Sequence, residues 1–503
     1  MPRSAALSAI GLLVVGALAV VPVWLSPVLV TTDGPSHVYN AMLADAVRAA
    51  RPPWAGDFRL VDRGLAPNQT NGLLLLHLGR LLGWEPAERV VMTIAVVAGY
   101  GVLLLLLAPL GRATVVLGAP LVAWLAHNWF VWMGFYDFGL SVAGYAALVL
   151  LLARPPTLQR TALLLVVLAF LYFTHFFTFA MGTGLALTAT AWRVLTRRGS
   201  WSEAWPLVPA VLVLLVVVGS GGAGAGAMTW SSPWKAVAGL VFGDIVRSFH
   251  PWEAGGGVAV MAGAWLAIVS RVRQARRGGL RALSGADAFG ILLLALSLVA
   301  PEAVGVGGYV PVRLQLLGVV TLLPAMAAAG AAAVRAGAGW LRVGATVVLL
   351  GFAAHALYIV RVARVVNGDL ATIDRLLGTA GSVESAWVRT RLVNWRRGLF
   401  RISGYRHLVE RIAMRRRLVV ADNYEALYQV FPLSWRARPD WLAFRPGDGG
   451  LVLELVPGDI SWPPPLYVVH ESALPLGTSD SRLELGRTAA AGAFAVTPVT
   501  RGR

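Results

Sequence analysis

The chain contains no cysteine and a single lysine, Lys235, among its 503 residues. The absence of cysteine excludes disulfide bonds, thiolate catalysis and cysteine-ligated metals. Carboxylates are also scarce, because 25 Asp and Glu stand against 43 Lys and Arg, for a formal net charge of +18. The arginines occur in short clusters between apolar runs, not as one long basic stripe with interleaved aromatic residues. We therefore expect no nucleic-acid partner.

Charged residues make up only 14% of the chain, whereas hydrophobic residues make up 57%. The mean hydropathy of +0.68 is far above that of a soluble enzyme of this length. This composition predicts an all-α polytopic protein in a lipid bilayer, with about eleven transmembrane helices. The eleven apolar segments lie at about 5–30, 88–110, 113–127, 137–153, 161–174, 176–193, 205–221, 256–270, 286–301, 313–334 and 343–360.

Arginine clusters mark alternate connections between these segments, which the positive-inside rule assigns to the cytoplasm. The connections at 31–87, 128–136, 222–255 and 302–312 then lie on the outer side, together with the tail from about 366. Arg361 and Arg364 flank the last span on that outer side, where the positive-inside rule expects few arginines. They therefore argue that the number of spans differs from this count by one.

The composition changes near Asn367, where acidic residues become frequent and long apolar runs stop. We expect a transmembrane domain at 1–365 and a small α/β or α+β soluble domain at 366–503, which is extracytoplasmic in this topology. About 135 residues suffice for a separate core. The periodicity predicts helix over roughly 368–417 and short strands at 417–421, 451–455, 466–470 and 493–496.

A polar insert, TTDGPSH at residues 31–37, directly follows the first apolar run. It places Asp33 and His37 at a membrane exit. An acid there can ionise and still face a substrate held in the lipid, which suits catalysis on a lipid-linked molecule. Asp33 and His37 share one face if a helix begins at Asp33. The alternative is a solvated helix end, with Asp33 as the N-cap and a local Asp–His pair.

Other polar residues near apolar boundaries fall on the same expected side. Asp137 begins a span among aromatic residues and could hold a sugar hydroxyl. Aromatic residues at this depth, however, more often form an interfacial belt than a surface for stacking a sugar. His175 lies in a turn between two short apolar helices, where a structural hydrogen bond is the commoner role.

Arg313 enters a late span after a glycine-rich turn, and its forked guanidinium is suited to a phosphate. Snorkelling to lipid headgroups is an equal alternative for this arginine. Two further outer-side residues, His250 and Glu302, complete the candidate substrate-binding set.

An acid directly after the first span, many spans of uneven length, polar residues gathered on one face and a C-terminal soluble domain together resemble the GT-C superfamily of membrane glycosyltransferases. The chain looks most like uncharacterised bacterial members, through Asp-Gly-Pro-x-His at Asp33–His37 and a glycine-rich turn followed by Arg313. The resemblance covers roughly residues 1–365. It implies an enzyme of the bacterial cytoplasmic (inner) membrane.

By this resemblance, Asp33 is the general base or the residue that orients the acceptor, and Arg313 contacts the phosphate of a polyprenyl-phosphate sugar donor. A hexosyl or pentosyl group would pass, with inversion, to a glycan, lipid or protein acceptor at the outer face. The chain has no clear Asp-x-Asp or Glu-x-Asp pair in its first loop, so a divalent cation stays an open alternative and no cofactor is established. The rival functions are a lipid or polysaccharide transporter and a non-catalytic membrane scaffold.

Overall fold

A computed structural model describes residues 3–219, 228–304, 307–382, 384–392, 399–428, 432–436, 442–447, 450–455 and 465–502. The chain divides into two units. The helical unit comprises Met1–Pro22, Met92–Val131 and Tyr136–Tyr358, and the mixed unit comprises Val23–Val91, Trp132–Phe135 and Ile359–Arg503. The expected division at residue 365 stays a prediction.

All eleven expected apolar segments form helices: α1 Arg3–Leu25, α5 Trp84–Leu107, α6 Arg112–Ala126, α8 Tyr136–Leu152, α9 Leu158–Thr174, α10 Phe176–Leu195, α11 Val208–Gly219, α13 Ala254–Gly278, α14 Gly285–Leu296, α15 Val310–Arg335 and α16 Trp340–Thr379. Within the described residues, seven helical segments are long and apolar enough to cross a membrane. Helices α8, α9 and α14 are shorter apolar helices. The prediction of a polytopic helical membrane protein is confirmed.

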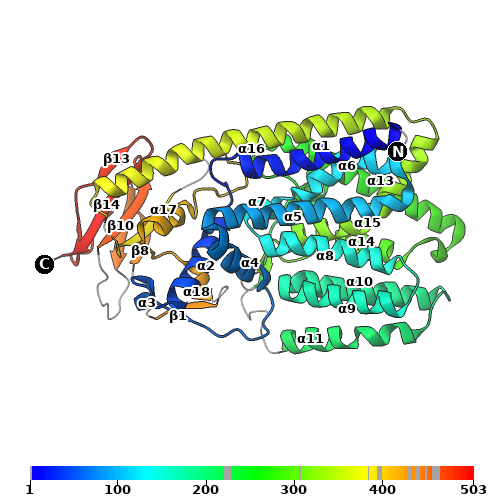
Figure 1. Ribbon diagram of the computed structural model, residues 1–503, viewed down its shortest axis with the longest axis horizontal. Coiled ribbons are helices and arrows are strands. Elements are labelled where there is room, and N and C mark those ends of the chain that lie inside the picture. The colour runs from blue at the N-terminus through cyan, green and yellow to red at the C-terminus, as the bar shows by residue number, and fades with distance from the viewer. Residues whose placement is uncertain are drawn as a thin grey trace. The chain divides into compact units, whose positions relative to one another are not determined.

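The helical unit is built from neighbouring antiparallel helices, and Figure 1 shows α8, α9, α10 and α11 side by side with nearly parallel axes. Helices α14 and α15 approach each other at two glycines. A Cβ added to Gly290 would lie 3.2 Å from the Gly318 carbonyl, and one added to Gly318 would lie 3.2 Å from the Gly290 carbonyl. Small residues permit this approach of two backbones, which dispersion then stabilises in lipid.

Short elements connect these helices. They are η1 Ala108–Leu110, α7 Trp129–Met133, η2 Trp201–Leu207, α12 Pro233–Phe242, η3 Pro251–Glu253 and η4 Leu280–Ala282, with a three-stranded sheet of β2 Met228–Thr229, β3 Ala303–Val304 and β4 Gly307–Gly308. Tyr309, which directly precedes α15, has a φ of +61°. This left-handed turn carries the chain from β4 into the helix that bears Arg313.

The N-terminal segment of the mixed unit contains α2 Gly34–Arg48, α3 Trp54–Asp57, β1 Phe58–Leu60 and α4 Thr70–Leu82. Its C-terminal segment contains β5 Trp387–Arg391, α17 Leu408–Arg416, β6 Val419–Val420, α18 Tyr424–Tyr428, β7 Leu433–Trp435, β8 Leu442–Gly447, β9 Gly450–Leu455, β10 Leu466–Glu471, β11 Leu476–Thr478, β12 Leu483–Leu485, β13 Ala489–Ala491 and β14 Phe494–Arg501.

A mixed sheet forms the core of this unit. Its strand order is β12-β14-β10-β5-β6, with β13 also paired to β14. Strand β10 pairs in parallel with β5 and antiparallel with β14, and all six of its residues are buried. A central strand covered on both faces explains the apolar run at 466–469. The two segments of the unit meet in sequence-distant pairs, since β1 pairs with β7 and α2 packs against α17 and α18.

The four predicted strands in the tail are confirmed as β6, β9, β10 and β14. The continuous helix predicted over 368–417 is wrong in its middle. Helix α16 ends at Thr379, and Trp387–Arg391 forms strand β5 between β10 and β6. Trp387 and Val388 are buried there, so tertiary pairing overrides the weak local preference of an arginine-rich stretch.

Candidate functional site

Asp33 lies at the N-terminus of α2 but does not cap it. Its side chain accepts no capping hydrogen bond from the first turn, although it is only 5% exposed. The backbone instead fixes its position, because the Asp33 N–H donates to the Met133 carbonyl at 2.9 Å. The capping alternative is therefore wrong, and the carboxylate is left for another role.

A glycine allows the chain at residues 132–135 to lie against the start of α2. Gly134 has a φ of +85°, which glycine alone adopts without strain. A Cβ added at this position would lie 2.3 Å from the Gly34 nitrogen and 3.0 Å from its Cα. Any other residue would therefore push the Asp33–Gly34 backbone out of place.

The carboxylate of Asp33 faces an imidazole from the C-terminal segment of the same unit. The Nε2 atom of His407 lies 3.5 Å from Asp33 Oδ1, and its Nδ1 atom lies 2.6 Å from Glu410 Oε1. All three residues are at most 5% exposed. His407 is thus held between two carboxylates, and Glu410, one turn along α17, fixes its ring orientation.

Burial raises the pKa of Asp33, and the nearby His407 and His37 only partly oppose this rise. Burial alone would lower the pKa of His407, but the Glu410 and Asp33 carboxylates together raise it above its usual value. A carboxylate with a raised pKa is a stronger base than an exposed aspartate. The cluster therefore suits proton acceptance.

His37 shares the face of α2 that bears Asp33 but pairs with a different carboxylate. Its Nδ1 atom lies 2.7 Å from Glu425 Oε1, and Glu425 is fully buried. One turn further, the side-chain amides of Asn40 and Asn423 exchange two hydrogen bonds of 3.1 and 2.8 Å. The residues around 423–425 therefore hold the first two turns of α2 through polar contacts.

A buried ion pair fixes the segment that leads into Asp33. Arg411 donates to Glu88 at 2.7 Å and to the Leu29 carbonyl at 3.0 Å. The hydroxyl of Thr31 donates to the same glutamate at 3.4 Å. Arg411 is 2% exposed and Glu88 is fully buried, so this pair is desolvated and each charge depends on the other.

The helical unit holds the second set of candidate residues, centred on Arg313. The guanidinium carbon of Arg313 lies 5.3, 5.7 and 5.9 Å from the ring centroids of Phe138, Phe130 and Phe177. The His175 ring lies 5.0 Å from that of Phe138. Aromatic faces stabilise a buried cation. The structure thus brings Arg313 and His175 together around Phe138.

Three further candidates belong to this unit. Asp137 occupies the first turn of α8. The His250 ring lies 5.4 Å from that of Tyr358 and accepts from the Trp252 N–H at 3.2 Å. Glu302 forms an ion pair of 2.9 Å with Lys235. Across the described ranges, no three His, Asp or Glu side chains converge as a metal site requires.

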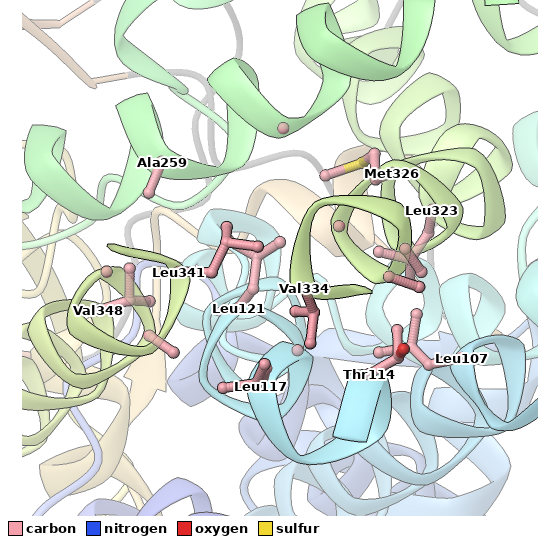
Figure 2. Close-up of a pocket in the computed structure, with 17 residues that line it drawn as sticks. Leu107, Thr114, Leu117, Leu121, Ala259, Leu323, Met326, Val334, Leu341 and Val348 are labelled. Atoms are coloured by element: carbon pink, nitrogen blue, oxygen red, sulfur yellow. The ribbon is translucent and has the colours of Figure 1, made fainter. Parts of the chain in front are cut away.

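The helical unit also encloses an apolar cavity of about 220 Å³ (Figure 2). Helices α5, α6, α13, α15 and α16 line it with Leu, Val, Ala, Gly and one Met, and Thr114 is its one polar side chain. Such a lining fits hydrocarbon and offers no proton donor or acceptor beyond that hydroxyl. The cavity is therefore unsuited to chemistry.

The sequence analysis does not predict the polar partners of Asp33 as site residues. His407 and Glu410 lie more than 370 positions further along the chain, in a stretch expected to belong to a separate soluble domain. Their spacing of three on a helix was the only local signal, and it is common in surface helices. Glu88 gave no signal, because it sits at the start of a long apolar run.

No family model and no curated protein matches the chain. Among solved structures, it is similar to apo ArnT from Cupriavidus metallidurans, with a TM-score of 0.50, 13% identity and 97% of each chain covered. ArnT bound to undecaprenyl phosphate gives a TM-score of 0.47 at 13% identity, over 98% of this chain and 97% of that one. The arabinofuranosyltransferase AftD from Mycobacteria gives 0.46 at 17% identity, over 98% of this chain and 40% of that one.

ArnT and AftD are GT-C membrane glycosyltransferases. The similarity to apo ArnT extends over nearly the whole of both chains, and it shows a shared fold. The protein is therefore a polytopic membrane protein with the GT-C fold, as the first-loop acid and the uneven spans predicted.

Proposed function

We propose that the protein is a membrane glycosyltransferase that moves a hexosyl or pentosyl group from a polyprenyl-phosphate donor to an acceptor at the outer face of the bacterial cytoplasmic membrane. The observation that carries this proposal is the buried Asp33 carboxylate, which caps no helix and faces the His407–Glu410 pair. Burying an ionisable group at this cost is typical of functional sites.

Asp33 acts as the general base in this mechanism. It takes the proton from the acceptor hydroxyl as the oxygen attacks the anomeric carbon of the sugar. The bond between that carbon and the donor phosphate breaks, and the phosphate leaves with the electron pair. Attack opposite to the leaving group inverts the configuration. His407, held by Glu410, orients the Asp33 carboxylate and supplies a compensating charge.

Arg313 is the residue proposed to bind the donor phosphate. Its guanidinium is always charged and offers two parallel donors to phosphate oxygens. The phenylalanines around it fix its position and exclude water, which strengthens its interaction with an anion. ArnT was solved with undecaprenyl phosphate bound, which supports a donor of this class. His37, Asp137, His175, His250 and Glu302 are the further proposed substrate contacts.

A screen of lipid-linked sugars tests the proposal. Purified protein in nanodiscs is given each polyprenyl-phosphate sugar with a panel of glycan, lipid and peptide acceptors, and products are identified by mass. We expect one donor to give a product heavier than its acceptor by one sugar residue, with release of one polyprenyl phosphate per product. Flux of intact lipid-linked sugar across the bilayer without any new bond would instead favour the transporter.

The outer-face location of the Asp33 site is tested by protease treatment of intact spheroplasts. In the proposed topology, the tail from about residue 366 is extracytoplasmic, and a C-terminal epitope is lost without lysis. Protection of the epitope until lysis would place the tail, and Asp33 with it, in the cytoplasm.

A further inference from the structure

A groove in the mixed unit lies outside the Asp33 cluster. It has a volume of about 920 Å³, comparable to the larger small-molecule sites of proteins. One wall is the last two turns of α16, from Thr372 to Thr379, with Ala380 directly after them. The other is the stretch from Arg487 through β13, with Pro498 of β14. Nothing in the proposed transfer chemistry uses this groove.

Each wall contributes one arginine. Arg375 comes from α16, and Arg487 comes from the segment between β12 and β13. Neither forms an ion pair with any carboxylate in the described part of the chain. The acid next to Arg375 is already engaged, because Asp374 pairs with Arg416 at 2.5 Å. The groove therefore carries two uncompensated positive charges.

The two threonine hydroxyls on the α16 wall of the groove are acceptors. Thr372 donates to the Gly368 carbonyl at 3.0 Å, and Thr379 donates to the Arg375 carbonyl at 3.0 Å. With its proton so used, each hydroxyl keeps lone pairs that can accept a hydrogen bond from a ligand hydroxyl. Arg375 also donates to Thr372 at 3.4 Å, which directs its guanidinium along the wall.

The wall formed by β13 has small side chains, so its polar groups are those of the backbone. Its residues are alanines, and among the described strands β13 pairs only with β14. An edge strand leaves backbone N–H and C=O groups for a ligand, and alanine side chains let that ligand approach them. None of the described residues that line the groove is aromatic, so they offer no flat surface on which a neutral sugar ring would stack.

We propose that this groove binds an anionic glycan, one that bears phosphate or carboxylate groups, through Arg375 and Arg487. The threonines and the β13 backbone bind its hydroxyls. If the protein has the proposed function, on which this part of the proposal rests, the glycan is the acceptor that presents a hydroxyl for transfer. The groove is then a recognition site for acceptor charge, distinct from the residues that carry out the reaction.

Binding of defined oligosaccharides to the full chain tests this proposal without any need for transfer. The protein is placed in phosphatidylcholine nanodiscs, and calorimetry compares a carboxylated oligogalacturonide with a neutral maltooligosaccharide of equal length. We expect the anionic probe to bind in a salt-dependent way and the neutral one to bind at least about tenfold more weakly. The double variant R375Q/R487Q should lose at least about tenfold in affinity for the anionic probe alone.

Arg501→Gln is the matched control, since Arg501 is an exposed arginine on β14 that does not line the groove. Its affinity should equal that of the wild type. Equal binding of both probes, or equal loss in the control and the double variant, would overturn the proposal. The proposal would also be overturned if phosphatidylglycerol nanodiscs competed with the anionic probe and the double variant abolished this competition, because the groove would then hold lipid headgroups. If the anionic probe binds but no sugar is ever transferred, the proposed function fails and the groove assignment stands.

Discussion

Replacement of His407 by glutamine tests how the Asp33 cluster works. His407 lies 3.5 Å from the Asp33 carboxylate, and the Glu410 and Asp33 carboxylates raise its pKa against the effect of burial, which favours the charged imidazolium. Glutamine keeps the size and a hydrogen-bond donor but removes the charge. The variant also leaves the Glu410 carboxylate without its cationic neighbour.

The size of the effect follows from the distance. Two unit charges 3.5 Å apart attract by about 5 kcal/mol at an effective dielectric constant of about 20. Glu410 cancels part of this attraction, so removal of the His407 charge gives a shift in the pKa of Asp33 that is smaller than the full attraction implies. Its direction is upward, since loss of a positive neighbour disfavours the carboxylate. A base works only when deprotonated, so the acidic limb of the activity profile moves to higher pH.

The assay is kcat/KM for sugar transfer as a function of pH, with the protein in nanodiscs and a donor found by the screen. His470→Gln is the matched control. His470 is also buried in the mixed unit, but its ring contacts backbone carbonyls and Thr497 in place of carboxylates. The control should keep the wild-type profile. An unmoved or downward-shifted acidic limb in His407→Gln, with the fold intact by fluorescence, would refute the reasoning.

Three further predictions concern residues around the two proposed sites. Gly134→Ala should lower the thermal midpoint and the transfer rate, because the left-handed φ costs at least about 1–3 kcal/mol and the new Cβ also clashes with Gly34. Gly64→Ala is the control: Gly64 has a φ of +49° but open space around it, so this variant should carry only the cost of the left-handed φ. Equal destabilisation by the two variants would contradict the close approach at Gly134. Arg411→Ala should destabilise by about 3–5 kcal/mol, because it leaves the buried Glu88 charge uncompensated, and Glu88→Gln added to it should restore part of that loss in thermal unfolding; no recovery would argue against the pair. Arg313→Ala should weaken binding of a polyprenyl phosphate by about 10- to 100-fold with transfer lost in parallel, and unchanged affinity by calorimetry would remove Arg313 from the donor site.

The membrane helices could be predicted from the sequence because their signal is local. Apolar runs and arginine clusters define spans without any knowledge of tertiary contacts, and all eleven segments are helices in the structure. The strand β5 could not be found in this way. Its five residues gain their identity from pairing with β10 and β6, and an arginine-rich stretch between helices gives no local sign of that pairing.

In the candidate site, too, some residues can be identified from the local sequence and others only from tertiary contacts. Asp33 and Arg313 were identified because each interrupts an apolar context, where a polar residue is costly. His407, Glu410 and Glu425 lie in a polar region of the sequence, where a histidine or a glutamate is unremarkable in composition. Only their burial against α2 marks them as site residues, and this burial arises from contacts between residues 374 and 388 positions apart.

The most direct test of the central claim is a single-turnover measurement on Asp33→Asn with a saturating donor. Asparagine preserves the shape of the side chain but cannot accept the proton. We expect donor binding to stay at the wild-type level while the transfer rate falls by at least about 100-fold. A variant that transfers sugar at the wild-type rate would contradict the assignment of Asp33 as the base.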